Sequence, residues 1–291
     1  MLALGIYEKA LPKETSWLTK LKMAKSLGFQ FVELSIDETD ERLARLEWSP
    51  DQIANVRQAI SETGVGIYSI CLSGHRRYPL GSADKAQREK ALVIMQQAID
   101  LASQLGVRTI QLAGYDVYYE TKTVASREYF VENLRKSVEM AAKKQVMLAI
   151  EIMDDPFMNS ITKFNRIKAE IPSPWLQVYP DIGNLSAWPM NDVSYELTQG
   201  IAAMTSVHLK DTIDVSTDFP GKFKNVPFGE GNVDFFGSLK ALKRLNYCGT
   251  FLIEMWSETS EQPIEEIKKA REFLIPIFEE AGYETRSINH C

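Results

Sequence analysis

The stretch VRTIQLAGYDVYYETKTVASREYFVENLRKSVEMAAKKQVMLAIEIM at residues 107–153 contains one complete strand–helix–strand unit. It begins with the apolar run 107–113 and ends with the apolar run 146–153. Between these runs, apolar residues recur every three or four positions, which is the spacing of one face of a helix: Phe130, Leu134, Val138 and Ala141. Two apolar strands joined by a helix predict neighbouring parallel strands.

The same alternation runs through the rest of the chain. Strand-like apolar runs occupy residues 2–7, 29–36, 65–72, 107–113, 146–153, 175–182, 203–210 and 249–256. Gly28, Gly64 and Gly106 each stand where a helix is expected to end in a left-handed C-cap before the next strand. Ser49-Pro50 predicts the start of a helix over 51–63, with an N-cap followed by proline at the first helical position.

Eight strand–helix units predict an α/β fold of the (β/α)8 TIM barrel type, because eight parallel strands can close into a barrel. A doubly wound open sheet is the alternative, although no glycine-rich fingerprint follows the first strand. The 291 residues match the length of one such barrel. We therefore expect a single domain over 1–291, with a polar and frayed tail at 282–291.

The composition is that of an ordinary globular protein and narrows the choice of partners. The net charge is −6 and no dense Lys/Arg block is present, which argues against a nucleic-acid partner. No apolar run is long enough to cross a membrane. Cys71, Cys248 and Cys291 lie far apart, which indicates reduced thiols and a cytoplasmic location. The assembly state stays open, a homo-oligomer included.

Four of the apolar runs end on a residue that can bind a metal ion. Glu151 closes MLAIE, Asp181 closes LQVYPD, His208 closes TSVH and Glu254 closes GTFLIE. The carboxyl ends of barrel strands meet at one rim, so strands five to eight could surround one cation. Each residue also has an ordinary alternative, since a carboxylate after a strand is often a helix N-cap and a buried histidine often bonds to backbone. For the metal site to be absent, an ordinary alternative would have to hold for all four residues at the same rim.

Three carboxylates and one imidazole form a shell of mostly oxygen donors. Such a shell suits one divalent ion, Mn²⁺, Mg²⁺ or Co²⁺, and Zn²⁺ also accepts it. A cation at this rim would stabilise the negative charge that develops when a carbon beside a carbonyl loses a proton. Glu151 and Glu254, on strands five and eight, would face each other across the substrate. One could remove a proton while the other returns one to the opposite face.

Several stretches resemble the L-ribulose-5-phosphate 3-epimerases, also called L-xylulose-5-phosphate 3-epimerases, of ascorbate and pentose catabolism. The matching stretches include LGIYEKALP at 4–12, HRRYPLGS at 75–82, YPDIGNLSAW at 179–188, VHLKDT at 207–212, FKNVPFGEG at 223–231 and LIEMWSE at 252–258. These enzymes belong to the xylose-isomerase-like barrel superfamily, and the resemblance runs through almost the whole chain.

The resemblance implies inversion at C3 of a ketopentose 5-phosphate, L-xylulose 5-phosphate to L-ribulose 5-phosphate, through an enediolate held by the metal. It also implies that Glu151, Asp181, His208 and Glu254 are the metal ligands and that the two glutamates double as catalytic acid and base. Related barrels that epimerise unphosphorylated ketoses have a histidine three residues after the ligand aspartate. This chain has Asn184 there, which we expect to contact the substrate.

A sugar phosphate also needs donors for its phosphate group, and two segments could supply them. The loop after strand seven carries Lys222, Lys224, Gly229 and Gly231, in the usual phosphate region of this fold. The cluster His75-Arg76-Arg77 follows strand three, and arginine suits bidentate phosphate contact. Both segments could equally be solvated loops. Glu33 ends an early strand in this interpretation and is a further candidate for a hydrogen bond to substrate.

Other functions stay open on the sequence alone. A 1,2-isomerase or an epimerase of different specificity would use the same barrel and metal. A non-catalytic sugar-phosphate binder could keep the pocket, although binding alone does not need two opposed carboxylates. A phosphodiesterase acting on damaged DNA is disfavoured, because multi-zinc versions need several histidines and this chain has three, together with an acidic balance.

Overall fold

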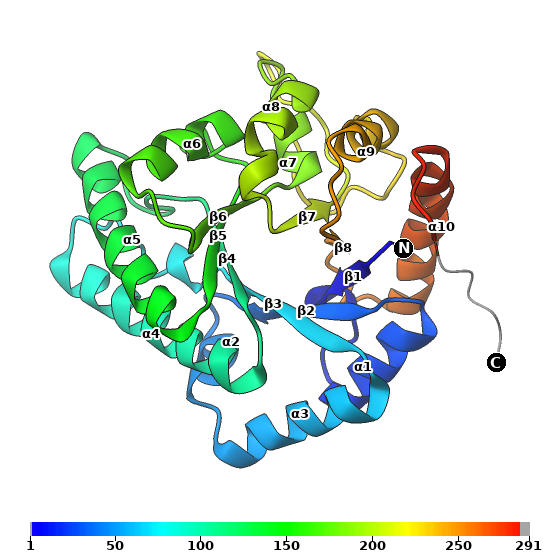
Figure 1. The fold of residues 1–291 in the computed structure, drawn as a ribbon, viewed down its shortest axis with the longest axis horizontal. Helices are drawn as coiled ribbons and strands as arrows, with labels where there is room; N and C mark the ends of the chain where they lie inside the picture. The colour runs from blue at the N-terminus through cyan, green and yellow to red at the C-terminus, as the bar shows by residue number, and fades with distance from the viewer. Residues whose placement is uncertain (1, 286–291) are drawn as a thin grey trace.

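The computed structural model describes residues 2–285, and its strands form one parallel barrel surrounded by helices (Figure 1). The eight strands lie in the order β6-β5-β4-β3-β2-β1-β8-β7. All the ladders between neighbours are parallel, as the alternation of strands and helices predicts. The predicted TIM barrel is therefore confirmed.

The strands are short and almost entirely buried, because helices cover their outer face and side chains fill the barrel. Their bounds are β1 Leu4–Tyr7, β2 Phe31–Ile36, β3 Gly66–Leu72, β4 Thr109–Ala113, β5 Met147–Glu151, β6 Leu176–Tyr179, β7 Ser206–Leu209 and β8 Thr250–Ile253. Each falls within a predicted apolar run, and each is shorter than its run.

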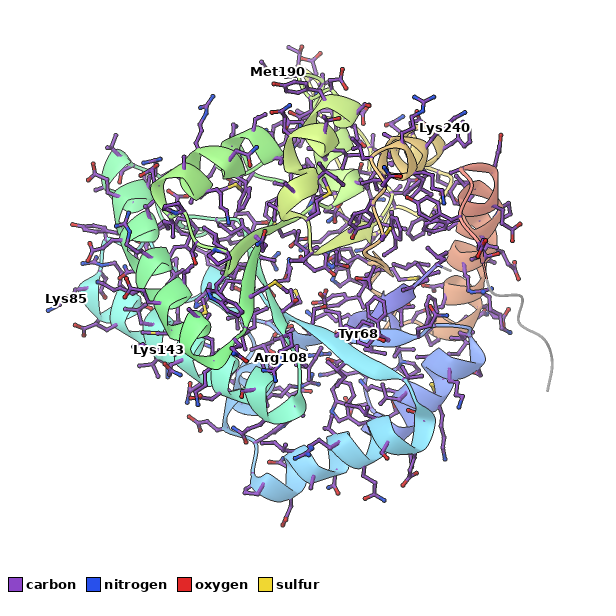
Figure 2. All side chains as sticks on the ribbon, viewed as in Figure 1. Tyr68, Lys85, Arg108, Lys143, Met190 and Lys240 are labelled. Atoms are coloured by element: carbon purple, nitrogen blue, oxygen red, sulfur yellow. The ribbon has the colours of Figure 1, made fainter. Side chains whose placement is uncertain are left out.

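The helices form the outer ring. The α-helices are α1 Trp17–Ser26, α2 Asp40–Leu43, α3 Pro50–Thr63, α4 Lys85–Leu105, α5 Val124–Lys144, α6 Ile161–Glu170, α7 Ile182–Ser186, α8 Val193–Gly200, α9 Phe235–Arg244 and α10 Pro263–Glu280. Short 3-10 turns are η1 Glu8–Ala10, η2 Ala44–Glu47, η3 Gly74–Arg76 and η4 Ile201–Ala203. Figure 2 shows Lys85, Lys143 and Lys240 on the outer side of this ring.

Local sequence signals set several helix ends. Ser49 caps α3 with a capping box, and Pro50 occupies its first turn, as Ser49-Pro50 predicts. Gly64 and Gly106 are left-handed C-caps, with φ of 71° and 77°. Gly28 is also left-handed, with φ of 82°, but it follows the C-cap Leu27 of α1.

The barrel has one weak seam, between β6 and β7. There the pairing is reduced to isolated parallel bridges, Val178 with Met204 and Asp181 with His208. The backbone N–H of His208 donates to the carbonyl of Pro180 at 2.8 Å. Two of the predicted metal ligands are therefore held side by side where the barrel closes.

The carboxyl end of the chain is partly anchored. The ring of Tyr283 packs edge-on against Phe251 and Phe278, and the carbonyl of Glu284 accepts a hydrogen bond from the N–H of Leu2 at 2.8 Å. This differs from the fraying expected from residue 282 onward, because aromatic packing holds the first part of the tail. The rest of that segment, 286–291, lies outside the described residues. Within residues 2–285, no helix is long and apolar enough to span a membrane.

Candidate metal centre

The four predicted ligands meet at the carboxyl ends of adjacent strands. Glu151 is the last residue of β5, Asp181 follows β6, His208 lies in β7 and Glu254 follows β8. One donor atom from each lies within 4.8 Å of the others. All four are buried, between 0% and 6% exposed. They form a group that could hold one metal ion.

Asp181 has two separate contacts, one for each carboxylate oxygen. Its Oδ1 accepts from the backbone N–H of Asn184 at 2.7 Å and caps α7. Among the described residues its Oδ2 accepts no hydrogen bond, and it lies 3.0 Å from the ammonium of Lys210 as an ion pair. The N-cap alternative is thus true of one oxygen only, while the other oxygen faces the neighbouring predicted ligands and the ammonium of Lys210.

Two side chains that the sequence did not single out contact the ligand group. The amide of Gln111, in β4, donates to Oε2 of Glu151. The ammonium of Lys210 lies 3.0 Å from both Oδ2 of Asp181 and Oε2 of Glu254. Lys210 comes directly after β7 and two residues after His208, so by the alternation of a strand the two side chains point to the same side of the sheet. That two-residue spacing was the available signal for it.

The electrostatics of the group reflect crowded negative charge. Burial raises the pKa of Glu151, and the neighbouring Glu254 raises it further. Burial also raises the pKa of Asp181, to about 8, against the opposing effect of Lys210. At Glu254, by contrast, Lys210 and His208 outweigh burial and bring the pKa to about 2. The ammonium of Lys210 and the imidazole of His208 do not balance the charge of the three converging carboxylates. A divalent cation would supply the missing positive charge.

The donor set fits a divalent metal ion. It offers carboxylate oxygens and one imidazole nitrogen, without thiolate, which is the shell of Mn²⁺, Mg²⁺, Co²⁺ or Zn²⁺. Nδ1 of His208 faces the carboxylates, at 3.0 Å from Oε1 of Glu151. Oδ2 of Asp181 lies in the same group, and its contact at 3.0 Å is the cationic ammonium of Lys210. These contacts favour a cation in this position.

A cavity opens beside the ligand group and carries several cationic side chains. Its lining is Tyr7, Lys9, Cys71, Ser73, Arg76, Glu151, Met153, Asp154, Lys210, Lys224, Glu254 and Trp256. Lys9 is paired with Asp37, and Lys210 with the ligands. Within the described part of the chain, Arg76 and Lys224 form no ion pair, and they contact aromatic rings instead. The buried Nε of Arg76 has no hydrogen-bond partner there.

Other predicted phosphate contacts have different roles. His75 is turned into the protein, where its Nε2 lies 3.1 Å from the carbonyl of Ala91 in α4. Arg77 points outward and pairs with Asp40 at 2.6 Å. Lys222 is exposed, and its backbone pairs with Ile213 across the loop after β7. Of the basic residues predicted, only Arg76 and Lys224 line the cavity, because side-chain direction in a loop is not visible in the sequence.

The glycines of the loop after β7 are also committed elsewhere. The N–H groups of Gly229 and Gly231 donate to Oδ2 of Asp211 at 2.8 and 3.0 Å. A Cβ on Gly231 would lie 2.1 Å from Oδ1 of Asp211, so glycine is what permits this approach. These N–H groups therefore bind an internal carboxylate, which corrects the expectation that they are free for a phosphate.

Asn184 and Glu33 lie deeper than expected. The amide of Asn184 donates to the carbonyl of Ile152 at 2.8 Å, and its side chain is fully buried. Glu33 lies within β2, which continues to Ile36, and its carboxylate is also fully buried. Both were predicted to contact substrate. The structure gives Asn184 a backbone partner and gives Glu33 two side-chain partners, His208 and Ser69.

With this geometry in place, sequence comparison decides the family. The family model described as xylose isomerase-like TIM barrel matches residues 21–277. The chain belongs to this family. It is also 54% identical over 281 residues to the L-ribulose-5-phosphate 3-epimerase UlaE of Shigella boydii serotype 18, covering 97% of this chain and 96% of the relative. It therefore belongs to the L-ribulose-5-phosphate 3-epimerase group and is an epimerase.

Two further relatives support the same placement. The chain is 57% identical over 280 residues to SgbU of Escherichia coli K12, covering 96% of this chain and 98% of the relative. The assignment of SgbU as an L-ribulose-5-phosphate 3-epimerase is itself provisional. Among solved structures, the IolI protein with a bound zinc atom aligns with a TM-score of 0.76 at 14% identity, over 96% of this chain and 99% of that chain. At this identity the likeness concerns the fold alone.

Proposed function

We propose that the protein is a metal-dependent epimerase that inverts C3 of a ketopentose 5-phosphate, converting L-xylulose 5-phosphate into L-ribulose 5-phosphate. The observation that carries the proposal is the convergence of Glu151, Asp181, His208 and Glu254 within 4.8 Å at the barrel rim. It occurs in a chain 54% identical to an L-ribulose-5-phosphate 3-epimerase. We expect the reaction to take place in the cytoplasm, a reducing compartment in which Cys71 and Cys248 would remain free thiols.

Glu151, Asp181, His208 and Glu254 would hold one divalent ion. When bound, such an ion supplies Lewis-acid stabilisation of the negative charge that develops on substrate oxygens. IolI, a barrel of the same fold, has zinc bound in its crystal structure, which makes Zn²⁺ one candidate beside Mn²⁺, Co²⁺ and Mg²⁺.

The two glutamates would move the proton. One carboxylate takes the C3 proton from one face of the sugar, and the other delivers a proton to the opposite face, which inverts the carbon. Their positions support this division, because Glu151 ends β5 and Glu254 follows β8, with β6 and β7 between them at the seam. Gln111 holds Glu151 in place, and Lys210 holds Glu254 through the ion pair at 3.0 Å.

The phosphate would bind at the end of the cavity formed by Arg76 and Lys224. The two side chains come from different loops, η3 after β3 and the segment after β7. Burial lowers the pKa of Lys224, and the positive charge of Arg76 lowers it further, as expected for two cations that share one small space. A dianion between them would relieve this repulsion and pair with the guanidinium.

Replacing Arg76 with alanine is expected to raise KM for the phosphorylated ketopentose by about 10-fold to 100-fold, because hydrogen bonds to charged groups contribute about 1.5–3 kcal/mol. Steady-state kinetics measures this change. Arg77→Ala is the matched control, since the neighbouring arginine pairs with Asp40 outside the cavity. Equal effects of the two substitutions would contradict the assignment of Arg76 to the phosphate.

Turnover in D2O tests the reaction itself. With L-xylulose 5-phosphate as substrate, deuterium at C3 of a pentulose product is the expected result. Deuterium at C1 of an aldose product would identify a 1,2-isomerase instead. Absence of turnover by the metal-loaded protein would favour a sugar-phosphate binder and contradict the proposal.

A further inference from the structure

Glu33 contacts His208 on the side away from the other three ligands and is not among the residues that line the cavity. Its carboxylate is 0% exposed. Oε2 accepts a hydrogen bond from the hydroxyl of Ser69 at 2.5 Å, and Oε1 lies 2.9 Å from Nε2 of His208. Ser69 stands opposite Glu33 in the β2–β3 register, so the sheet itself fixes the first of these contacts. Both oxygens of this buried side chain are therefore used.

The imidazole of His208 spans the space between Glu33 and the other ligands. While Nε2 contacts Glu33, Nδ1 faces the three ligand carboxylates, at 3.0 Å from Glu151, 3.8 Å from Glu254 and 3.9 Å from Asp181. The ring of Tyr179 packs against the imidazole, with centroids 4.5 Å apart and an angle of 62° between the planes. The two ring nitrogens thus have different and fixed surroundings.

We propose that Glu33 is a positioning residue that prepares His208 to bind the metal ion. Both ring nitrogens lie near carboxylate oxygens, but only Nδ1 faces the residues that would hold the ion. With a cation on the Nδ1 side, the proton of the imidazole would stay on Nε2, because the Glu33 carboxylate can only accept a hydrogen bond. The lone pair of Nδ1 would then be available to an ion held between His208 and the three ligand carboxylates. This proposal rests on the proposed metal site, and it assigns Glu33 a role different from substrate contact.

A carboxylate behind a histidine ligand fixes the ring orientation and makes the ligand nitrogen more basic. Removal of such a partner typically lowers metal affinity by about 10-fold to 100-fold. A merely structural buried glutamate would affect folding without selecting one ring nitrogen. The two roles therefore predict different results for metal affinity and for the proton on His208.

The first measurement is the affinity of Glu33→Gln for Zn²⁺, determined by competition with a chelator. The substitution keeps the shape of the side chain and removes its charge, so we expect affinity to fall by about 10-fold to 100-fold. Glu196→Gln is the matched control. Glu196 is a buried glutamate of α8 that bonds to Thr162, outside the metal centre, and its variant should keep wild-type affinity.

The second measurement needs no substitution at Glu33 and stays informative if that variant does not fold. In Zn²⁺-loaded protein with ¹⁵N-labelled histidine, NMR should show a proton on Nε2 of His208, shifted downfield by its carboxylate partner, and no proton on Nδ1. The chain has three histidines, and His75→Gln removes the signal of the other buried ring.

The outcomes separate this proposal from the proposed function. Wild-type affinity in Glu33→Gln, or a proton on Nδ1 with Nε2 bound to zinc, would overturn the role of Glu33 while leaving the metal site intact. Failure of the wild-type protein to bind Zn²⁺, Mn²⁺, Co²⁺ or Mg²⁺ would overturn both. A loss of affinity together with the proton on Nε2 would support the role.

Discussion

Glu151→Gln is expected to lower kcat by at least about 10²–10⁴-fold while the protein remains folded. General acid–base groups contribute factors of this size, and the substitution removes the base while keeping an oxygen near the metal position. The amide of Gln111 can still bond to the new side chain, so the local packing at the end of β5 is retained. Initial rates with L-xylulose 5-phosphate, together with thermal unfolding, measure the effect.

Exchange of the C3 hydrogen with solvent gives a more specific test. Each of the two glutamates would act on one face of the sugar, so each would exchange the C3 hydrogen of one epimer. Glu151→Gln should lose the washout of C3 deuterium from one epimer and retain it for the other. Glu254→Gln should show the reverse pattern. Glu196→Gln controls for the loss of a buried carboxylate elsewhere. Near-wild-type rates for Glu151→Gln, or the same pattern in both variants, would contradict the two-base assignment.

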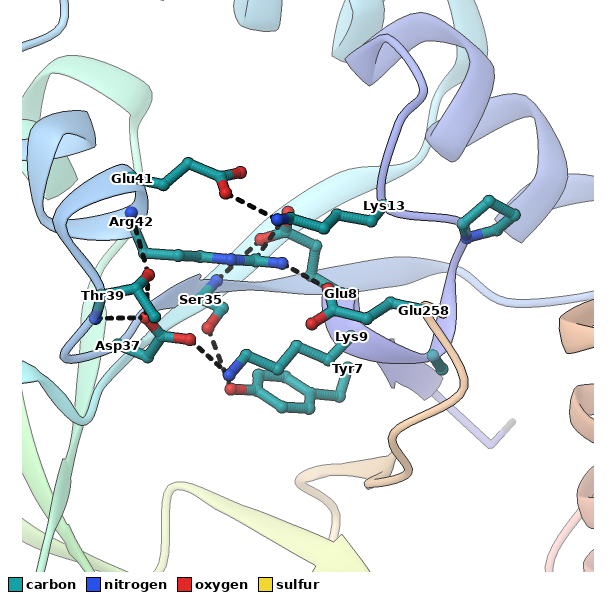
Figure 3. Close-up of polar contacts among 12 residues, drawn as sticks. Tyr7, Glu8, Lys9, Lys13, Ser35, Asp37, Thr39, Glu41, Arg42 and Glu258 are labelled. Atoms are coloured by element: carbon teal, nitrogen blue, oxygen red, sulfur yellow. Dashed lines mark hydrogen bonds and ion pairs between the residues drawn. The ribbon is translucent and has the colours of Figure 1, made fainter. Parts of the chain in front are cut away.

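Glu8→Gln is expected to lower the free energy of unfolding by about 3–5 kcal/mol at neutral pH, because it leaves buried cations without their partner. Glu8 is 0% exposed and lies 2.6 and 2.8 Å from the guanidinium of Arg45. It also forms ion pairs with Arg42 at 2.9 Å and Lys20 at 3.4 Å. Figure 3 shows Arg42 between Glu8 and Glu258, so the network joins η1, α2 and the segment after β8.

The same residue predicts a pH dependence. Burial acts to raise the pKa of Glu8, but Arg45, Arg42 and Lys20 outweigh it and bring the pKa to about 2. In the unfolded chain a glutamate has a pKa of about 4.3. The stabilisation is therefore fully present above about pH 4.3, where it amounts to about 3 kcal/mol, and it is lost as the pH falls toward 2.

Urea unfolding of wild type and Glu8→Gln across this pH range measures both effects. The difference between the two proteins should be largest at neutral pH and should shrink as the pH approaches 2. Glu41→Gln is the control, since Glu41 pairs with Lys13 on the surface and should leave the unfolding free energy nearly unchanged. A constant difference across the pH range would contradict the role of the Glu8 charge.

The barrel and the convergence of Glu151, Asp181, His208 and Glu254 could be predicted because their signals are local. Each of these four residues closes an apolar run, and the carboxyl ends of parallel strands meet at one rim regardless of the loop conformations. The N-cap at Ser49 and the left-handed glycines at 64 and 106 are equally local. A few residues of sequence are enough to recognise each of them.

The side chains that contact the four residues from behind could not be predicted, because these contacts depend on which side chains meet across the closed barrel. Glu33 is 175 residues from His208 in the chain, and Gln111 is 40 residues from Glu151. The role of Asp211 depends on hydrogen bonds that the loop after β7 makes with itself. For this reason Gly229 and Gly231 looked like phosphate donors in the sequence and bind an internal carboxylate in the structure.

Metal content tests the central claim most directly. Elemental analysis of the purified wild-type protein should find one divalent ion per chain, and a chelator should remove the ion and the activity together. His208→Ala should bind the ion much more weakly, because it deletes the nitrogen that faces Glu151, Asp181 and Glu254. Full turnover by metal-free wild type, or full occupancy in His208→Ala, would contradict a single cation held by these four residues.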